Sequence, residues 1–226
     1  MGCKLKSVRR GKNPTRVLLV DDHPIVRERL ADIIHRQPDL RVCAEAEDRA
    51  QALHAIEREQ PDLAIVDLTL KDSDGLELIK DLHSRWPEIL VLVVSMHDES
   101  LYAERAIRAG ARGYITKQQA SRDILVALRR VLQGNIYLNE TIATNIISRL
   151  TARPGAVGAT PVELLGDREL QVFELPGRGV NPRKIADRLR IGVKTVETYR
   201  ARIREKLNLK DASELLQLAI SWTHRR

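Results

Sequence analysis

Five short apolar runs alternate with longer amphipathic segments between residues 16 and 135, and this alternation restricts the possible folds more than any other feature of the sequence. Each run ends in polar residues and is followed by a segment with the periodicity of a helix. Strands joined by helices are parallel, and their connections are right-handed. We therefore predict one parallel sheet with helices on both faces. Its strands are predicted at 17–20, 41–46, 63–66, 89–94 and 113–115, and its helices at 25–36, 50–59, 76–86, 100–109 and 121–133.

The last third of the chain has a different character. Residues 141–150 have helical periodicity, whereas residues 151–161 are small and rich in proline and glycine, which is typical of a flexible linker. Only helical patterns follow, and helices are predicted at 167–175, 182–189, 193–207 and 212–222. Two short helices, a turn containing glycine and a longer basic helix form the outline of a helix-turn-helix.

Charge divides along similar boundaries. Residues 1–15 carry five Lys/Arg and no acidic residue, and we interpret them as a disordered basic tail. Residues 16–135 carry 17 basic and 21 acidic residues, whereas residues 161–226 carry 14 basic and nine acidic residues. A basic helical end is a candidate for binding nucleic acid. The predicted organisation is a tail (1–15), an α/β domain (16–135), a linker helix with a flexible linker (136–161) and a small all-α domain (162–226).

Composition excludes several classes of protein. No apolar stretch approaches the roughly 20 residues that a membrane-spanning helix needs, so we expect a soluble protein. The two cysteines, Cys3 and Cys43, are not spaced as zinc ligands and indicate no disulfide framework. These features fit a protein of the reducing cytoplasm.

Carboxylates follow two of the predicted strands. Asp67 comes directly after the run Leu63–Val66, and Asp21 and Asp22 come directly after Val17–Val20. Sites in open parallel sheets form at the carboxyl ends of the strands, so we expect these three side chains to lie close together. For a single aspartate, capping of the next helix is the simpler interpretation. Three carboxylates together repel one another unless a cation lies between them, and ligands that are all oxygen favour Mg²⁺.

A hydroxyl and an ammonium follow two further strands, at Ser95 and Lys117. Such a set suits phosphoryl transfer to a carboxylate, because a metal ion and fixed donors must share the negative charge of the phosphoryl oxygens. In this hypothesis Asp67 is the nucleophile, and Asp21 and Asp22 hold Mg²⁺ directly or through water. Lys117 and Ser95 each bind a phosphoryl oxygen.

These motifs resemble the receiver domain of bacterial response regulators. The resemblance rests on Val-Asp-Asp-His-Pro at 20–24, Asp67, Ser95 and Gly-Tyr-Ile-Thr-Lys at 113–117, and it covers about residues 16–135. It implies a five-stranded, doubly wound, flavodoxin-like fold in which Asp67 accepts a phosphoryl group from a sensor histidine kinase. It also implies that the Thr69 carbonyl binds Mg²⁺ and that Ser95 and Tyr114 rearrange as a switch.

Two positions of this half need a separate interpretation. Lys71 stands where the family usually has proline, four residues beyond the acceptor, and a second ammonium near the phosphate is expected to alter loop rigidity or phosphoryl lifetime. His23 precedes Pro24, and we assign it to the start of a helix rather than to proton transfer.

The predicted helix 193–207 has one apolar side, which includes Val196 and Ile203, and an opposite side that is small and mostly polar. Such a helix can present a small face to bases while its cations reach phosphates. A solvated amphipathic helix is the alternative. The Asn181-Pro182 start and the Gly192 turn that precede it favour the helix-turn-helix.

The helical end resembles the LuxR-type helix-turn-helix, and the whole chain resembles a response regulator of the NarL/FixJ type. The carrying motifs are Asp-Arg-Glu-Leu at 167–170, Pro-Arg-Lys-Ile-Ala at 182–186, Lys-Thr-Val-Glu-Thr-Tyr-Arg at 194–200 and Lys-Leu-Asn-Leu at 206–209. The resemblance places Lys194, Glu197, Thr198 and Ala201 nearest the base edges, and it assigns Thr195, Arg200, Arg202, Arg204 and Lys206 to phosphates or packing.

Three residues depart from the LuxR-type pattern. Gly166 and Gly192 stand where serine or threonine usually caps a helix, which costs only a few tenths of a kcal/mol each. Pro176 lies near the end of the first helix of this domain, and we expect it to shorten that helix by a turn.

We therefore predict a transcription factor that is controlled by phosphorylation of Asp67 and is not an enzyme. Its expected partners are a sensor histidine kinase, double-stranded DNA and a second copy of the chain when active. One alternative is a receiver whose helical domain binds protein or RNA. Another is an aspartyl-phosphate phosphatase, but that enzyme needs a second acid two residues beyond the nucleophile, and this chain has Thr69 there.

Overall fold

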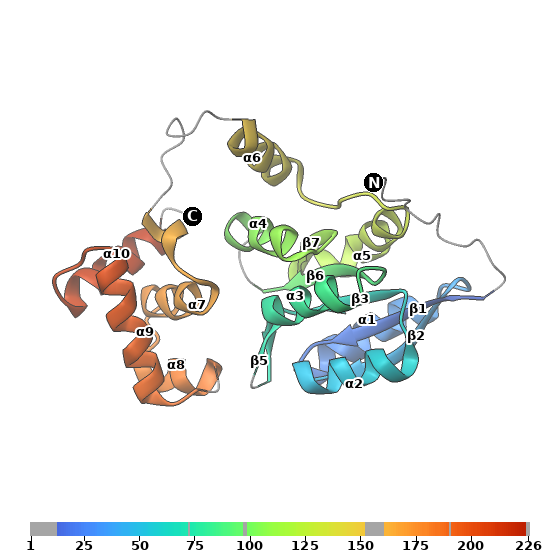
Figure 1. The fold of residues 1–226 in the computed structure, drawn as a ribbon, viewed down its shortest axis with the longest axis horizontal. Helices are drawn as coiled ribbons and strands as arrows, with labels where there is room; N and C mark the ends of the chain where they lie inside the picture. Colours follow the sequence, from blue (N-terminus) through green and yellow to red (C-terminus); the bar gives the residue numbers. More distant parts are fainter. Residues whose placement is uncertain (1–12, 72, 97–98, 152–160, 190, 225–226) are drawn as a thin grey trace. The chain divides into compact units, whose positions relative to one another are not determined.

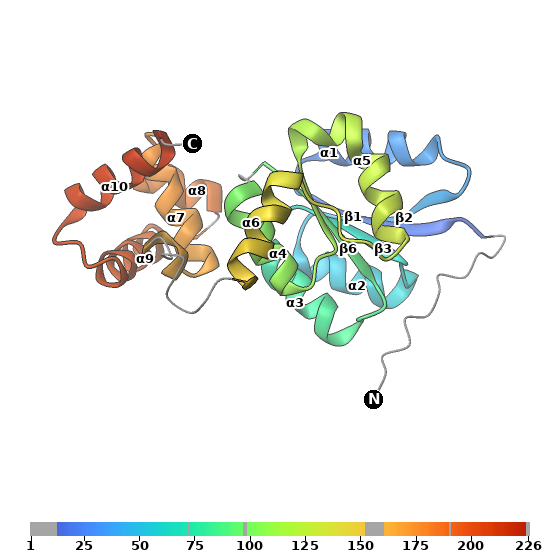
Figure 2. The ribbon, with the colours of Figure 1, turned by 90° about the horizontal axis from the view of Figure 1, so that it is seen from above.

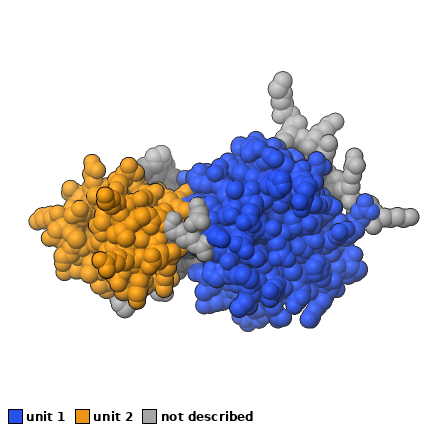
Figure 3. Space-filling model, turned by 90° about the horizontal axis from the view of Figure 1, so that it is seen from below, with its two compact units in different colours: residues 1–150 blue, residues 151–226 orange. Residues whose placement is uncertain are grey.

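The computed structural model describes residues 13–71, 73–96, 99–151, 161–189 and 191–224. The chain divides into two compact units, residues 1–150 and 151–226 (Figure 3). Most of the predicted basic tail and of the predicted flexible linker lies outside the described residues.

A five-stranded parallel sheet forms the centre of the first unit, as predicted (Figure 1). The order of its strands is β2-β1-β3-β6-β7. The chain therefore turns from β1 to one side and then returns to place β3 on the other, which makes the carboxyl ends of β1 and β3 a topological switch point. The strands are β1 (Thr15–Val20), β2 (Leu40–Ala46), β3 (Leu63–Val66), β6 (Leu90–Ser95) and β7 (Gly113–Thr116).

Helices cover both faces of this sheet. One face carries α1 (Pro24–His35) and α5 (Lys117–Leu132), and the other carries α2 (Arg49–Glu59), α3 (Gly75–Arg85) and α4 (Glu99–Ala109) (Figure 2). All four residues of β3 are buried, and so are the last four of β1. Apolar residues on both faces of the central strands are therefore removed from water, which explains the continuous apolar runs in the sequence.

Helix α5 begins at Lys117, four residues before the predicted start. Thr116 forms a capping box with Gln119: the Thr116 Oγ1 atom accepts from the Gln119 amide at 3.3 Å, and the Gln119 Oε1 atom accepts from the Thr116 amide at 3.1 Å. Because the cap closes directly after β7, Lys117 is fixed in the first turn of a helix rather than on a loop.

A short antiparallel hairpin was not predicted. It consists of β4 (Thr69–Leu70) and β5 (Ser73–Asp74) and follows Asp67, the predicted nucleophile. Strands of two residues have no readable periodicity, so apolar patterning gives no signal for them.

The chain after α5 pairs with the edge of the sheet before α6 (Glu140–Thr151) begins. The Tyr137 amide donates to the Arg112 carbonyl, and the Tyr137 carbonyl accepts from the Tyr114 amide, both at 2.9 Å. The Asn139 amide donates to the Glu99 carboxylate at 3.0 Å. A Cβ atom at Gly113 would lie 3.2 Å from the Tyr137 carbonyl oxygen, so a residue without a side chain permits this close approach.

The second unit is helical, as predicted. Its core holds Phe173 edge-on to Trp222, with ring centroids 6.4 Å apart, and the buried side chains of Val196 and Ile203. Its elements are the 3₁₀ helix η1 (Pro161–Leu164) and the helices α7 (Asp167–Gly177), α8 (Pro182–Leu189), α9 (Val193–Lys206) and α10 (Ala212–His224).

The prediction that Pro176 shortens the first helix of this unit is wrong. Helix α7 continues through Pro176 to Gly177. Proline in the last turn removes one backbone donor, while the carbonyls of Leu175 and Pro176 still accept from residues 178–180. At the other end, Glu169 accepts from the Gly166 amide at 2.7 Å, which supplies half of a capping box.

Gly177 sets how closely α7 approaches α10. A Cβ atom at this position would lie 2.4 Å from the Ala219 carbonyl oxygen and 2.3 Å from Thr223 Oγ1. We expect Gly177→Ala to destabilise the helical unit by about 1–3 kcal/mol, because α10 must shift outward. Gly192→Ala is the matched control, since its added Cβ would meet no atom closer than 3.6 Å. Urea denaturation of full chains that also carry Trp86→Phe, followed by the fluorescence of the remaining Trp222, compares them; equal midpoints would contradict the prediction.

Candidate functional site

The carboxyl ends of β1 and β3 and the first turn of α5 bring Asp21, Asp67 and Lys117 together. The Lys117 Nζ atom lies 2.6 Å from Asp21 Oδ2 and 2.8 Å from Asp67 Oδ2. The three side chains are at most 8% exposed. One ammonium therefore bridges two buried carboxylates, as buried charges require a partner.

Burial and neighbouring charge act in opposite directions on these groups. Burial, reinforced by the charge of Asp67, raises the pKa of the Asp21 carboxyl above its ordinary value, although Lys117 opposes the rise. Burial alone would lower the pKa of Lys117, but the charges of Asp67 and Asp21 and their hydrogen bonds raise it. The lysine is thus held as a cation, and it only partly offsets the repulsion between the two carboxylates.

The second oxygen of Asp67 is available for chemistry. The Asp67 Oδ1 atom is buried and has no hydrogen-bond partner among the described residues. One ligand atom each from Asp21, Asp22, His23 and Asp67 lies within 4.8 Å of the others. An unsatisfied buried oxygen in a cluster of carboxylates fits a hard divalent cation such as Mg²⁺.

His23 is the N-cap residue of α1, which agrees with its assignment to a helix start. Its ring also reaches the acidic cluster, with Nδ1 2.6 Å from Asp22 Oδ1 and 3.1 Å from Asp21 Oδ1. This proximity was not predicted, because sequence spacing does not show which way a ring turns after a strand.

The other predicted site residues of this unit lie on neighbouring elements. Ser95 ends β6, where it pairs with Thr116, and its side chain is fully buried. Tyr114, on β7, is also fully buried rather than half exposed at the sheet edge. Thr69 begins β4, two residues beyond Asp67.

Lys71 contacts a glutamate rather than the acidic cluster. Its Nζ atom lies 3.7 Å from Glu47 Oε2, and its amide donates to the Glu47 carbonyl at 3.1 Å. The expected second ammonium beside the phosphate is therefore engaged elsewhere in this structure.

Gly75 has a structural role that sequence reasoning missed. A Cβ atom at this first residue of α3 would lie 2.1 Å from the Asp67 carbonyl oxygen. The start of α3 therefore lies directly against the backbone of Asp67. A glycine after an aspartate cap is the only signal in the sequence, and it does not show the close approach.

The predicted DNA-facing residues divide into two groups on α9. Seven of the nine are exposed, namely Lys194, Thr195, Glu197, Thr198, Ala201, Arg202 and Lys206. Arg200 and Arg204 are only partly exposed, and Arg200 donates to Glu197 at 2.9 Å. Lys206 is exposed but pairs with Glu169 at 2.7 Å, so the end of α9 is tied to the start of α7.

Two family models match the chain. Residues 17–129 match the response regulator receiver domain, and residues 163–219 match the bacterial regulatory proteins of the luxR family. The oxygen regulatory protein NreC of Staphylococcus carnosus is 30% identical over 209 residues, which cover 91% of this chain and 96% of that protein.

Solved structures show the same architecture. A LuxR-family two-component response regulator from Aurantimonas sp. is 34% identical, covers 62% of this chain and all of that one, and has a TM-score of 0.56. RcsB from Salmonella typhimurium is 24% identical with a TM-score of 0.65, and the match covers 92% of this chain and 98% of that one. Among the described residues, no helix is long and apolar enough to cross a membrane.

The raised pKa of Asp21 predicts a pH dependence of stability. Because the folded carboxyl binds a proton more tightly than the unfolded one, the folded state loses stability as pH rises from about 3.8 through the raised pKa. Asp21→Asn removes this contribution. We expect urea denaturation without divalent ions to show a steeper fall in the free energy of unfolding for the wild type than for Asp21→Asn between pH 4 and 7. If the free energy of unfolding falls equally with pH in the wild type and in Asp21→Asn, the prediction is wrong.

Proposed function

Because this chain belongs to the two-component response regulators that join a receiver domain to a LuxR-type DNA-binding domain, we propose that Asp67 accepts the phosphoryl group and thereby controls DNA binding by α9. The chain is a transcription regulator and not an enzyme. The phosphoryl donor in this proposal is a sensor histidine kinase, and the protein acts in the cytoplasm.

One observation carries the assignment of the acceptor. Asp67 is buried with one oxygen on Lys117, while the other has no hydrogen-bond partner among the described residues. In the proposed transfer an Asp67 oxygen forms a bond to phosphorus, and the bond from phosphorus to the kinase histidine breaks. Lys117 and Ser95 bind phosphoryl oxygens. Mg²⁺ neutralises their charge when bound, and Asp21, Asp22, Asp67 and the Thr69 carbonyl would hold it.

The proposed switch consists of Ser95 and Tyr114. Ser95, at the end of β6, pairs with Thr116, which ends β7 directly before Lys117. In the proposed switch the Ser95 hydroxyl moves toward a phosphoryl oxygen, at the same edge of the sheet that carries Lys117. Tyr114 lies on that neighbouring strand, and its amide bonds to the segment that leads toward the DNA-binding unit. This connection supports a role for Tyr114 in coupling the two units.

The proposed nucleic-acid partner is double-stranded DNA, bound by a dimer of the active form. Lys194, Glu197, Thr198 and Ala201 lie on the exposed surface of α9, which suits base edges in a major groove. RcsB, which has the same fold, has been solved on promoter DNA with a phosphomimetic, and this supports the proposal. A helical unit that binds protein or RNA is the second candidate.

Removal of the acceptor tests the first half of the proposal. We expect wild-type protein to form a phosphoprotein with acetyl phosphate and Mg²⁺, and Asp67→Asn to form none, because an amide nitrogen is not a nucleophile for phosphorus. Gel retardation of phosphoproteins measures the product, and Asp74→Asn is a matched control on the adjacent hairpin. Equal phosphorylation of Asp67→Asn would overturn the assignment.

Selection from random DNA duplexes tests the second half. We expect beryllofluoride with Mg²⁺ to increase enrichment of one sequence by the wild type but not by Asp67→Asn. If no sequence is enriched in either state, DNA recognition by α9 is wrong. If enrichment is the same with and without beryllofluoride, and the same in wild type and Asp67→Asn, then the protein binds DNA but Asp67 does not control the binding.

Salt dependence on the selected duplex distinguishes the two kinds of cation on α9. Arg202 is exposed, so Arg202→Ala should reduce the slope of log affinity against log salt concentration by about 1. Lys206→Ala should change the slope less, because Glu169 already neutralises that ammonium. Equal changes in slope would show that the ion pair opens on DNA.

A further inference from the structure

A partly buried arginine on α1 supports the backbone of the acidic cluster. The Arg27 Nη1 atom donates to the carbonyl oxygen of Asp21 at 2.6 Å, and the Arg27 side chain is 12% exposed. Asp21 and Asp22 are consecutive, so this bond fixes the peptide that carries both carboxylates. The sequence gives no sign of it, because an arginine one turn into a helix usually faces solvent.

Two glutamates, Glu45 and Glu47, bind the remaining nitrogen atoms of the Arg27 guanidinium. Arg27 Nε donates to Glu45 Oε2 at 3.1 Å, and Arg27 Nη2 lies 3.5 Å from Glu47 Oε1. A planar guanidinium can serve three acceptors in fixed directions, which an ammonium cannot do. Glu45 and Glu47 also neutralise a charge that is mostly removed from water.

Glu47 links this arginine to the hairpin that follows the acceptor. Its second carboxylate oxygen lies 3.7 Å from Lys71 Nζ, and its carbonyl accepts from the Lys71 amide at 3.1 Å. Ser73 closes the turn: its hydroxyl donates to the Lys71 carbonyl at 2.9 Å and accepts from the Arg49 amide at 3.1 Å. Thr69, the predicted carbonyl ligand, lies on this same hairpin.

We propose that Arg27, Glu47 and Lys71 are positioning residues that hold the two parts of the metal site at a fixed separation. One part is the peptide of Asp21 and Asp22, and the other is the hairpin that begins at Thr69. This inference rests on the proposed function, since the separation matters only if a cation binds both parts. None of the three residues binds the cation itself.

Lys71 holds the hairpin through its backbone amide as well as through its side-chain charge, and both contacts are with Glu47. Proline, the usual residue at this position in the resembled family, has no amide hydrogen and cannot donate to the Glu47 carbonyl. In this chain the hairpin is tied to the loop after β2 by that backbone bond and by an ion pair, rather than by a rigid ring. An ion pair with partners that are 46% and 37% exposed is weak and sensitive to salt.

Magnesium affinity, measured by titration calorimetry, tests the proposal. We expect Arg27→Lys to weaken Mg²⁺ binding about tenfold, as substitutions of residues that orient ligands do. Lys71→Met should weaken it by roughly twofold to threefold, and this difference should vanish in about 1 M salt, where the Debye length is ~3 Å. Lys80→Met, which removes an exposed ion pair on α3 with Glu77, is the matched control and should leave the affinity unchanged.

Hydrogen exchange in protein without metal provides the second measurement. We expect the amides of β4 and β5 to exchange faster in Glu47→Gln and Lys71→Met than in wild type, whereas β3 and β6 keep their protection. If the wild type binds no Mg²⁺, the proposed function is wrong, and hydrogen exchange still decides whether the contacts restrain the hairpin. Unchanged affinity and unchanged exchange in folded Arg27→Lys and Lys71→Met would overturn the inference.

Discussion

The Lys117 ammonium between Asp21 and Asp67 is the interaction on which the first unit depends. It joins the ends of β1 and β3 to the start of α5, three elements that are far apart in the sequence. The parallel sheet makes this possible, because its topological switch point brings the carboxyl ends of β1 and β3 side by side. The same arrangement places the carboxylates of Asp21, Asp22 and Asp67 around one ammonium, so negative charge exceeds positive charge at this site. Binding of a cation, or a change of charge at Asp67, alters this excess directly.

Much of this site followed from the sequence, because apolar runs define the strands and their polar ends define a shared rim. The parallel direction of the five strands and the proximity of Asp21, Asp22 and Asp67 were predicted in this way, whereas the order of the strands was not. The start of α5 was not, since its cap consists of Thr116 and Gln119, which resemble any polar turn. Contacts of Arg27, Glu47 and Lys71 depend on side-chain directions from a helix, a loop and a hairpin turn, and no periodicity encodes those.

The helical unit shows a different limit of sequence reasoning. The apolar positions of α9 were correctly assigned to the core, because Val196 and Ile203 recur at helical spacing and are fully buried. The effect of Pro176 was misjudged, because the cost of a proline depends on how many turns follow it. Lys206 was assigned to phosphates or packing, and its ion pair with Glu169 could not be read from the spacing of α9 alone.

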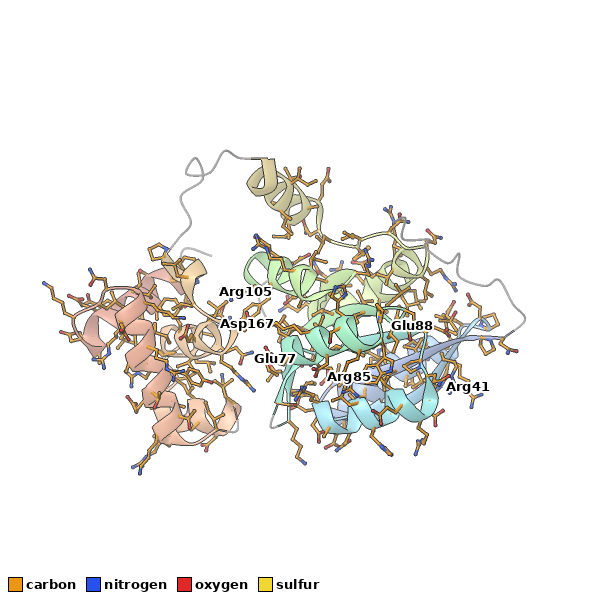
Figure 4. The ribbon with its side chains drawn as sticks, in the orientation of Figure 1. Arg41, Glu77, Arg85, Glu88, Arg105 and Asp167 are labelled. Atoms are coloured by element: carbon orange, nitrogen blue, oxygen red, sulfur yellow. The ribbon has the colours of Figure 1, made fainter. Side chains whose placement is uncertain are left out.

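The pairing of Tyr137 with β7 has a consequence for how the protein resists aggregation. An open sheet has two edges whose free backbone groups can recruit strands from other molecules. Here the chain itself occupies part of the β7 edge. The opposite edge strand, β2, carries the charged side chains of Arg41, labelled in Figure 4, and Glu45. A strand from another molecule that paired with β2 would have to bury the charges of Arg41 and Glu45. Pairing within the chain at part of one edge and charged side chains at the other both disfavour the addition of a strand from another copy.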